Sequence, residues 1–366
     1  MVRRWMGAGA MAMTAMLSLS AAARPFTPHS FRDEIAVLGM GGAYTAGAWR
    51  GSGLFYNPAS LARKRFHLNV PIRAELGGIG GLGQLKGVTD YFRNNRKDLE
   101  DVDQLLPDRL AALDQRAEAL DDNGAVLRVF PAVRLGWQHV SVQTYVVLDG
   151  APQMNAGVFQ PRLDLSGFGD AGVIAGYGHT FHTRDHTWYA GVAGKSFLRW
   201  RVNRSFVPEE AARESQIYND LVNSIGEDRR YGIGIDAGVQ VPLAKTFVVG
   251  VAAQDLATFG QVRPEMCLNA GIYYRILPRI HLVADYHDLL DAEALPIPMH
   301  VYFGGELDLT LVRLRAGAYQ GYPTFGMGIN LWLMKIDFVY YSRERGRQLG
   351  DQPEDNLAFE LEFGLD

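Results

Sequence analysis

The tripeptide Gly194-Lys195-Ser196 has the residue types that end a phosphate-binding loop, in which backbone N–H groups cradle the phosphates and a lysine reaches them. That motif also needs a glycine five residues before Gly194, and position 189 is Tyr189. The run around it alternates apolar with polar or small residues, as a strand does, and does not lead into a helix. We therefore do not expect a nucleotide site here.

A second cluster of reactive side chains is rich in histidine. His179, His182, Asp185 and His186 fall at a predicted turn, and imidazoles at such spacing can bind a metal ion. A second half of such a site is not evident, so a solvated turn is the favoured interpretation. The sequence shows no Ser-His-Asp arrangement, GxSxG elbow or supported carboxylate pair. We therefore predict no metal site, no cofactor, no catalytic residue and no enzymatic activity.

The segments that carry these residues show a long, regular alternation. Between residues 231 and 241 every second residue is apolar, and the residues between them are glycine, Asp236 or Gln240. A period of two places one set on each face of a strand. Runs of about ten residues are typical of transmembrane strands, whereas strands of soluble sandwiches are usually about 5–6 residues long. Fourteen such strands are predicted near 66–76, 125–137, 140–149, 168–180, 187–200, 229–241, 246–256, 263–276, 279–288, 299–308, 311–320, 323–332, 334–342 and 355–365.

The pattern predicts an all-β fold, a transmembrane antiparallel β-barrel of about 14 strands spanning 66–366. A further segment at 154–165 is preceded by Pro152 and interrupted by Pro161, so we expect a loop there, because proline cannot donate a ladder hydrogen bond. Bacterial barrels alternate short periplasmic turns with longer outer loops. In agreement, each long connection follows an odd-numbered strand; these connections are 77–124, 150–167, 201–228, 289–298 and 343–354.

If the strands form a transmembrane barrel, their polar side chains are expected to face one particular side of the wall. A charge that faced lipid would cost about 2–4 kcal/mol at the bilayer midplane, so we expect charged strand residues to face the lumen. His281, Asp285 and His287 share one strand face, and Arg313 and Arg315 share another. The predicted lumen-facing polar residues are His281, Asp285, His300, Glu306, Arg313, Arg315, Lys335 and Asp337.

The start of the chain reads as a cleavable signal peptide over residues 1–23. Arg3 and Arg4 form a basic region, an apolar stretch follows, and small residues at 21–23 suit cleavage. The apolar stretch is short for the ~20 residues of a spanning helix. We therefore expect export and location in the cell outer membrane. Cys267 is the only cysteine, so the chain can form no internal disulfide.

Two insertions look helical, at about 88–123 and 206–226. In the first, leucines and other apolar residues recur at spacings of three and four, which is one face of a helix. Both insertions fall in connections predicted to lie outside the cell, over the barrel mouth. A solvated lid without a ligand is the favoured interpretation of both.

Residues 24–65 contain two motifs: Gly39-Met40-Gly41-Gly42-Ala43-Tyr44-Thr45-Ala46 and Tyr56-Asn57-Pro58-Ala59-Ser60-Leu61-Ala62. They resemble the N-terminal segment of outer-membrane barrels of the FadL, PorV and TraF-like group. The resemblance implies a hatch, or plug, that folds into or under the barrel lumen, carried by Gly39, Gly41, Gly42, Asn57 and Pro58. The C-terminal half, with Leu314-Arg315-Ala316-Gly317 and Gln320-Gly321-Tyr322-Pro323, is similar to TraF-type members.

Two functions remain open on this resemblance. The first is passive transport of hydrophobic small molecules across the outer membrane, which predicts an apolar pocket near the hatch. The alternative is a non-transporting barrel of a secretion or conjugal-transfer apparatus, which predicts a polar, plugged lumen. A soluble periplasmic β protein is a third interpretation. The expected partners are outer-membrane lipid and either a hydrophobic ligand or a secretion-system protein. A net charge of −4 gives no case for nucleic acid, and a monomer is the default expectation.

Overall fold

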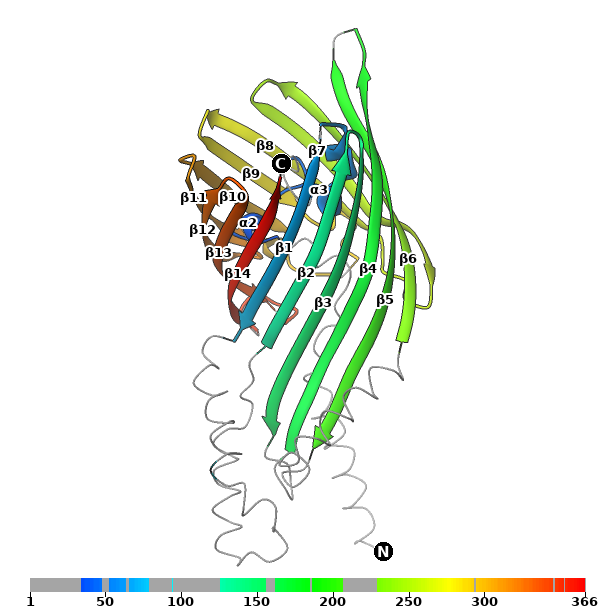
Figure 1. Ribbon diagram of the computed structural model, residues 1–366, viewed down its shortest axis with the longest axis vertical. Coiled ribbons are helices and arrows are strands. Elements are labelled where there is room, and N and C mark those ends of the chain that lie inside the picture. The colour runs from blue at the N-terminus through cyan, green and yellow to red at the C-terminus, as the bar shows by residue number, and fades with distance from the viewer. Residues whose placement is uncertain are drawn as a thin grey trace, which may run out of the picture.

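The structure is a computed structural model that describes residues 34–47, 53–63, 66–78, 94, 126–155, 162–184, 186–206, 229–292, 294–344, 346–351 and 353–365. Its strands form one closed barrel (Figure 1). They are β1 (His67–Gly77), β2 (Val126–Trp137), β3 (Val140–Asn155), β4 (Arg162–His182), β5 (Thr187–Phe206), β6 (Arg229–Ala244), β7 (Phe247–Gly260), β8 (Cys267–Leu277), β9 (Ile280–Tyr286), β10 (Val301–Asp308), β11 (Val312–Tyr319), β12 (Tyr322–Leu331), β13 (Met334–Glu344) and β14 (Pro353–Leu365).

Each strand pairs antiparallel with its neighbours in sequence, and β1 pairs with β14 to close the barrel, from Leu68↔Leu365 to Gly77↔Asn356. The predicted all-β barrel of 14 strands is therefore confirmed, and each strand overlaps its predicted range. No helix in the described part of the chain has the length and apolar character to cross a membrane.

The barrel is polar on the inside and apolar on the outside. Along β1, His67, Asn69, Arg73 and Glu75 are buried on the inner face, while Ile72 on the outer face is 47% exposed. The same alternation continues around the wall, because a strand of period two presents one residue type to each side. Among the described residues the exposed large hydrophobic side chains are mostly leucine, valine, isoleucine and phenylalanine.

Residues 34–47 and 53–63 fold inside the barrel, and we call them the inner segment (Figure 1). They contain the single-turn helices α2 (Ile35–Leu38) and α3 (Gly53–Tyr56) and the 3₁₀ helix η2 (Pro58–Arg63). Helix α2 packs against β12, β13 and β14, and η2 packs against β4, β5 and β6. The inner segment thus spans from one wall of the lumen to another and supplies about half of the buried hydrophobic residues.

One expectation about the strands was wrong. The connection after β3, predicted at 150–167, is shorter, because β3 continues to Asn155 and β4 begins at Arg162. Pro152 is tolerated because β2 pairs with β3 only as far as Gly150, so the strand has a partner on one side only at Pro152. Similarly, β5 extends to Phe206, the first residue of the second predicted insertion.

The connections that follow even-numbered strands are short, as predicted. Examples are Gln138-His139, Lys245-Thr246 and Trp332-Leu333. The signal peptide at 1–23 and, apart from residue 94 and residue 206, the helical insertions at 88–123 and 206–226 lie outside the described residues. Their structure and the orientation of the barrel stay predictions.

Candidate functional site

The inner segment is attached to the wall by a carboxylate on β9. Asp285 Oδ2 accepts hydrogen bonds from the backbone N–H groups of Tyr44 at 2.7 Å and Thr45 at 2.8 Å. His287 Nε2 lies 3.3 Å from the same oxygen. A carboxylate that accepts two backbone N–H bonds makes stronger bonds than a neutral acceptor would. Asp285 therefore fixes the loop between α2 and α3 against the wall.

Asn57 forms a second attachment, at the start of η2. Its side-chain Nδ2 donates to the carbonyl oxygens of Thr45, Val239 and Val251 at 3.0, 3.3 and 3.2 Å. Its Oδ1 accepts from the N–H of Ala59 at 3.0 Å. The amide thus joins both parts of the inner segment to β6 and β7, and all its groups are used in a fully buried position.

Glycines in the wall make room for this close approach. A Cβ on Gly238 would overlap Asn57 Oδ1, and a Cβ on Gly191 would overlap the carbonyl group of Pro58. On the other side, Gly41 has φ +72° and its N–H lies so close to Gly317 that neither position has room for a Cβ. Gly42 has φ +81°, and Gly39 packs on Gly326 of β12. All five predicted hatch residues, Gly39, Gly41, Gly42, Asn57 and Pro58, therefore lie at contacts between the inner segment and the wall.

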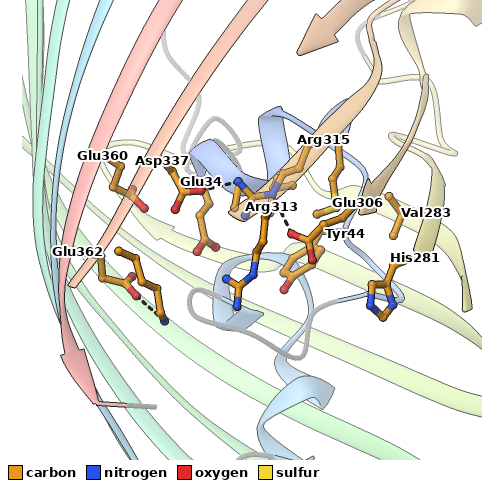
Figure 2. Close-up of a pocket in the computed structure, with 14 residues that line it drawn as sticks. Glu34, Tyr44, His281, Val283, Glu306, Arg313, Arg315, Asp337, Glu360 and Glu362 are labelled. Carbon is orange, nitrogen blue, oxygen red and sulfur yellow. Dashed lines mark hydrogen bonds and ion pairs between the residues drawn. The ribbon is translucent and has the colours of Figure 1, made fainter. Parts of the chain in front are cut away.

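A small cavity of about 40 Å³ lies between α2 and the wall (Figure 2). Six of the predicted lumen-facing residues line it, namely His281, Glu306, Arg313, Arg315, Lys335 and Asp337. Arg315 Nε donates to Glu306 Oε2 at 2.8 Å, and Arg315 also pairs with Asp337. Lys335 pairs with Glu362 at 3.0 Å. The cavity is therefore lined by charges of both signs held across neighbouring strands.

The other two predicted polar residues lie elsewhere. Asp285 binds the inner segment, as described above. His300 follows the short 3₁₀ helix η5 (Ile297–Met299), where its ring nitrogens lie 2.8 Å from His287 O and 3.1 Å from Leu295 O. His300 therefore holds the connection between β9 and β10 in place.

Sequence reasoning missed several residues of the cavity. Glu34 precedes α2, and Glu360 and Glu362 lie on β14 with their side chains at the cavity. The alternation of the last strand places Glu360 and Glu362 on its polar face, and that signal could have found them. The sequence carries no such signal for Glu34, because the segment around it shows no regular alternation of apolar and polar residues.

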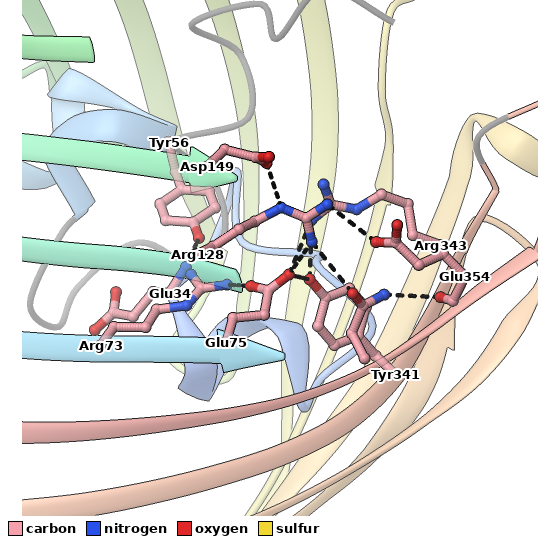
Figure 3. A network of polar contacts seen from close by, with 10 residues as sticks. Glu34, Tyr56, Arg73, Glu75, Arg128, Asp149, Tyr341, Arg343 and Glu354 are labelled. Atoms are coloured by element: carbon pink, nitrogen blue, oxygen red, sulfur yellow. Dashed lines mark hydrogen bonds and ion pairs between the residues drawn. The ribbon is translucent and has the colours of Figure 1, made fainter. Parts of the chain in front are cut away.

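A larger ionic network ties the closure of the barrel together (Figure 3). Glu75 of β1 pairs with Arg73 and Arg128 and accepts a hydrogen bond from the Tyr341 hydroxyl at 2.7 Å. Arg128 also donates to Asp149 of β3 and Glu354 of β14, at 2.6 and 3.0 Å. The network therefore links β1, β2, β3, β13 and β14 across the seam where the two ends of the sheet meet.

The region of the phosphate-loop-like tripeptide is also a structural ion network. Lys195 lies in β5 and contacts Asp236 at 3.0 Å and Asp255 at 2.8 Å. The predicted strand is confirmed, and Lys195 points into the lumen and not to a helix terminus. Farther along the same strand, Arg199 forms a bidentate pair with Asp170. Arg199 also lines a second cavity of about 210 Å³, together with Arg201, Arg230, Gln261, Val262 and Arg263.

The sequence matches no family model, and no curated protein matches it. The fold, however, is similar to solved structures. The toluene transporter TodX of Pseudomonas putida shares 12% identity with a TM-score of 0.52, over 90% of this chain and 96% of TodX. A second TodX structure and a TodX deltaS2S3 mutant, described as a monoaromatic hydrocarbon channel, share 10% and 9% identity with TM-scores of 0.50, each over 90% of this chain and 97% of theirs.

At these identities the comparison concerns the fold alone. The predicted resemblance to the FadL group is confirmed at that level. The chain forms a closed 14-strand antiparallel barrel with the fold of the toluene transporter TodX.

Proposed function

We propose that this chain is an outer-membrane channel for the passive transport of hydrophobic small molecules, with residues 24–65 as its hatch. The observation that carries the proposal is the way the inner segment closes the lumen. It is held by side-chain hydrogen bonds from Asn57 and Asp285 and by apolar contacts, and not by strand pairing. Such contacts can be released without opening the barrel.

The outer surface supports a membrane location. A contiguous apolar surface around a closed barrel, over a polar interior, is the arrangement that a lipid bilayer stabilises. Trp332, at 88% exposure, and Trp137, at 66%, lie at short turns between strands, where amphipathic rings favour the membrane interface. Export by a signal peptide at 1–23 belongs to the same proposal.

The contacts beneath the inner segment suggest what would pass. Tyr44 and Tyr56 pack with Val37 and Met40 against the wall residues Val283 and Tyr302. Tyr273 and Tyr319 of the wall adjoin the same cluster. Withdrawal of the inner segment would therefore uncover an aromatic strip of wall, and an apolar solute could replace the lost contacts. The fold neighbour TodX is described as a toluene transporter, which agrees with such a solute.

Uptake by whole cells tests the proposal. Apolar solutes cross simple phospholipid vesicles unaided, so the assay needs an intact outer membrane. We expect Gram-negative cells that make the chain to take up radiolabelled toluene several-fold faster than cells with an empty vector, with sugar uptake unchanged. Equal toluene uptake, with the protein recovered in the outer-membrane fraction, would count against transport.

One observation favours the second candidate, a non-transporting barrel of a secretion or conjugal-transfer apparatus. Most of the residues that line the two cavities described above carry a charge. A lumen filled with ion pairs suits a permanently plugged barrel. That candidate predicts no uptake of any apolar probe, together with stoichiometric co-purification of a protein that is lost when the 88–123 insertion is removed.

A further inference from the structure

The geometry points to a divalent-cation site inside the barrel, formed by Glu34 of the inner segment with Glu360 and Glu362 of β14. We infer that it binds a hard cation, Ca²⁺, through carboxylate oxygens. The site goes beyond the proposed transport function and does not depend on it.

The spacing of the three carboxylates fits such an ion. One oxygen from each of Glu34, Glu360 and Glu362 can be chosen so that all lie within 4.8 Å of one another. Oxygen ligands bind Ca²⁺ at about 2.3–2.6 Å, so two ligands of one ion lie no more than about 5 Å apart. The three oxygens therefore lie within the reach of a single ion before any side chain moves.

Glu360 gives an independent reason to expect a ligand. Its side chain is 4% exposed and lines the cavity, yet it forms no hydrogen bond or ion pair with any described residue. Its cross-strand neighbours are Asp337 on β13, another acid, and Arg73 on β1, whose guanidinium pairs with Glu75. Glu34 and Glu362 also repel its charge. A buried carboxylate without a partner is costly, and like charges directly opposite on paired strands are destabilising. A cation at this position would remove both penalties.

The bases around the cluster do not fully balance it. Arg134 of β2 contacts Glu362 at 3.0 Å and Glu34 at 3.5 Å, and it attracts Glu360 only at longer range. Lys335 contacts Glu362 at 3.0 Å. Arg134 and Lys335 thus contact Glu362 and Glu34, and neither base contacts Glu360.

The cavity also provides space. Its volume of about 40 Å³ exceeds the roughly 10–15 Å³ that one buried water occupies on this measure, so an ion with one or two waters fits. Waters are the usual means of completing a shell of six or more oxygens when the protein supplies three carboxylates.

An ion at this place would join the inner segment to the wall. Glu34 lies directly before α2, and its backbone N–H donates to the Tyr56 hydroxyl at 3.0 Å. Glu360 and Glu362 belong to the strand that closes the barrel against β1. The cation would therefore join the inner segment to β14, beside the ion pair that joins Glu34 to Arg134 of β2.

Cation binding to the whole purified protein in detergent tests the inference. After EDTA treatment and dialysis, we would titrate Ca²⁺ by calorimetry and Tb³⁺ by luminescence, excited through Tyr44, which lines the same cavity. The variant Glu360→Gln keeps the side-chain size and removes the charge. Glu354→Gln is the matched control, because Glu354 is buried on the same face of the same strand and pairs with Arg128 instead.

We expect one Ca²⁺ per chain in the parent protein and in Glu354→Gln, and at least tenfold weaker binding in Glu360→Gln. Glu34→Gln should weaken binding likewise, and it provides the test if Glu360→Gln fails to form a barrel. No saturable binding up to millimolar Ca²⁺ in the parent, or equal affinity in Glu360→Gln, would overturn the inference.

Discussion

The carboxylate of Asp285, in the barrel wall, accepts a hydrogen bond of 2.7 Å from the backbone N–H of Tyr44, in the inner segment. The same oxygen accepts the N–H of Thr45 at 2.8 Å. The strand pattern predicts only that Asp285 is polar and faces inward. In the structure, Asp285 also holds the inner segment in place. Transport through this barrel would require these bonds to break.

Replacement of Asp285 should loosen the inner segment without unfolding the barrel. In Asp285→Ala the N–H groups of Tyr44 and Thr45 lose their acceptor, which costs about 1–3 kcal/mol for buried groups. A local loss of about 2 kcal/mol would raise the population of the open state of the inner segment roughly 30-fold. Hydrogen exchange followed by mass spectrometry should show faster exchange at 34–47 and unchanged exchange in β1–β6. Uniformly faster exchange would mean that Asp285 supports the whole barrel instead.

At Asn57, aspartate should be worse than alanine. Asn57→Ala removes three donated hydrogen bonds, whereas Asn57→Asp also places a negative charge against the carbonyl oxygens of Thr45, Val239 and Val251. We expect the exchange rate of 53–63 to rise in the order parent, Ala, Asp. The reverse order of the two variants would show that the amide N–H groups are not what holds Asn57.

Two glycines of β5 allow the effect of close packing against η2 to be distinguished from the general effect of replacing a glycine in a strand. A methyl group at Gly191 would overlap the carbonyl group of Pro58, while at Gly194 it would meet no described atom within 4 Å. Gly191→Ala should therefore destabilise by about 1–3 kcal/mol through overpacking. Gly194→Ala should be neutral or slightly stabilising. Thermal unfolding in detergent measures both, and equal midpoints would contradict the close packing of η2 on β5.

The outer wall should reject charge. Met327 lies in the middle of β12, is 41% exposed and points outward. Met327→Arg should reduce the stability of the barrel in lipid by about 2–4 kcal/mol if this position is near the bilayer midplane. Met327→Leu, which keeps the volume and the apolar character, should have little effect. Urea unfolding from lipid vesicles compares them; a neutral arginine variant would argue against a lipid-facing wall.

The strands could be predicted because alternation of side chains is a local property of sequence. It locates β6 from the run 231–241 and separates Ile235, outside, from Asp236, inside. The extension of β3 beyond Pro152 could not be predicted this way, since it depends on where the neighbouring strand β2 stops pairing.

Of the residues that line the cavity, only some of those on the strands were predicted. Arg315 and Asp337 follow from the period of β11 and β13, and both line it. Glu34 does not follow from any period, because a segment with little regular structure takes its shape from tertiary contacts. The position of Asn57 was expected from a resemblance, but its three carbonyl partners depend on how β6 and β7 lie in space.

We propose that hydrophobic small molecules pass this barrel when the inner segment moves. The most direct measurement compares the rate of radiolabelled toluene uptake by cells that make equal amounts of the parent, Asn57→Asp or Gly194→Ala protein in the outer membrane. We expect several-fold faster uptake with Asn57→Asp than with the parent, and equal uptake with Gly194→Ala. Unchanged uptake with Asn57→Asp, in protein whose inner segment exchanges faster, would contradict this proposal.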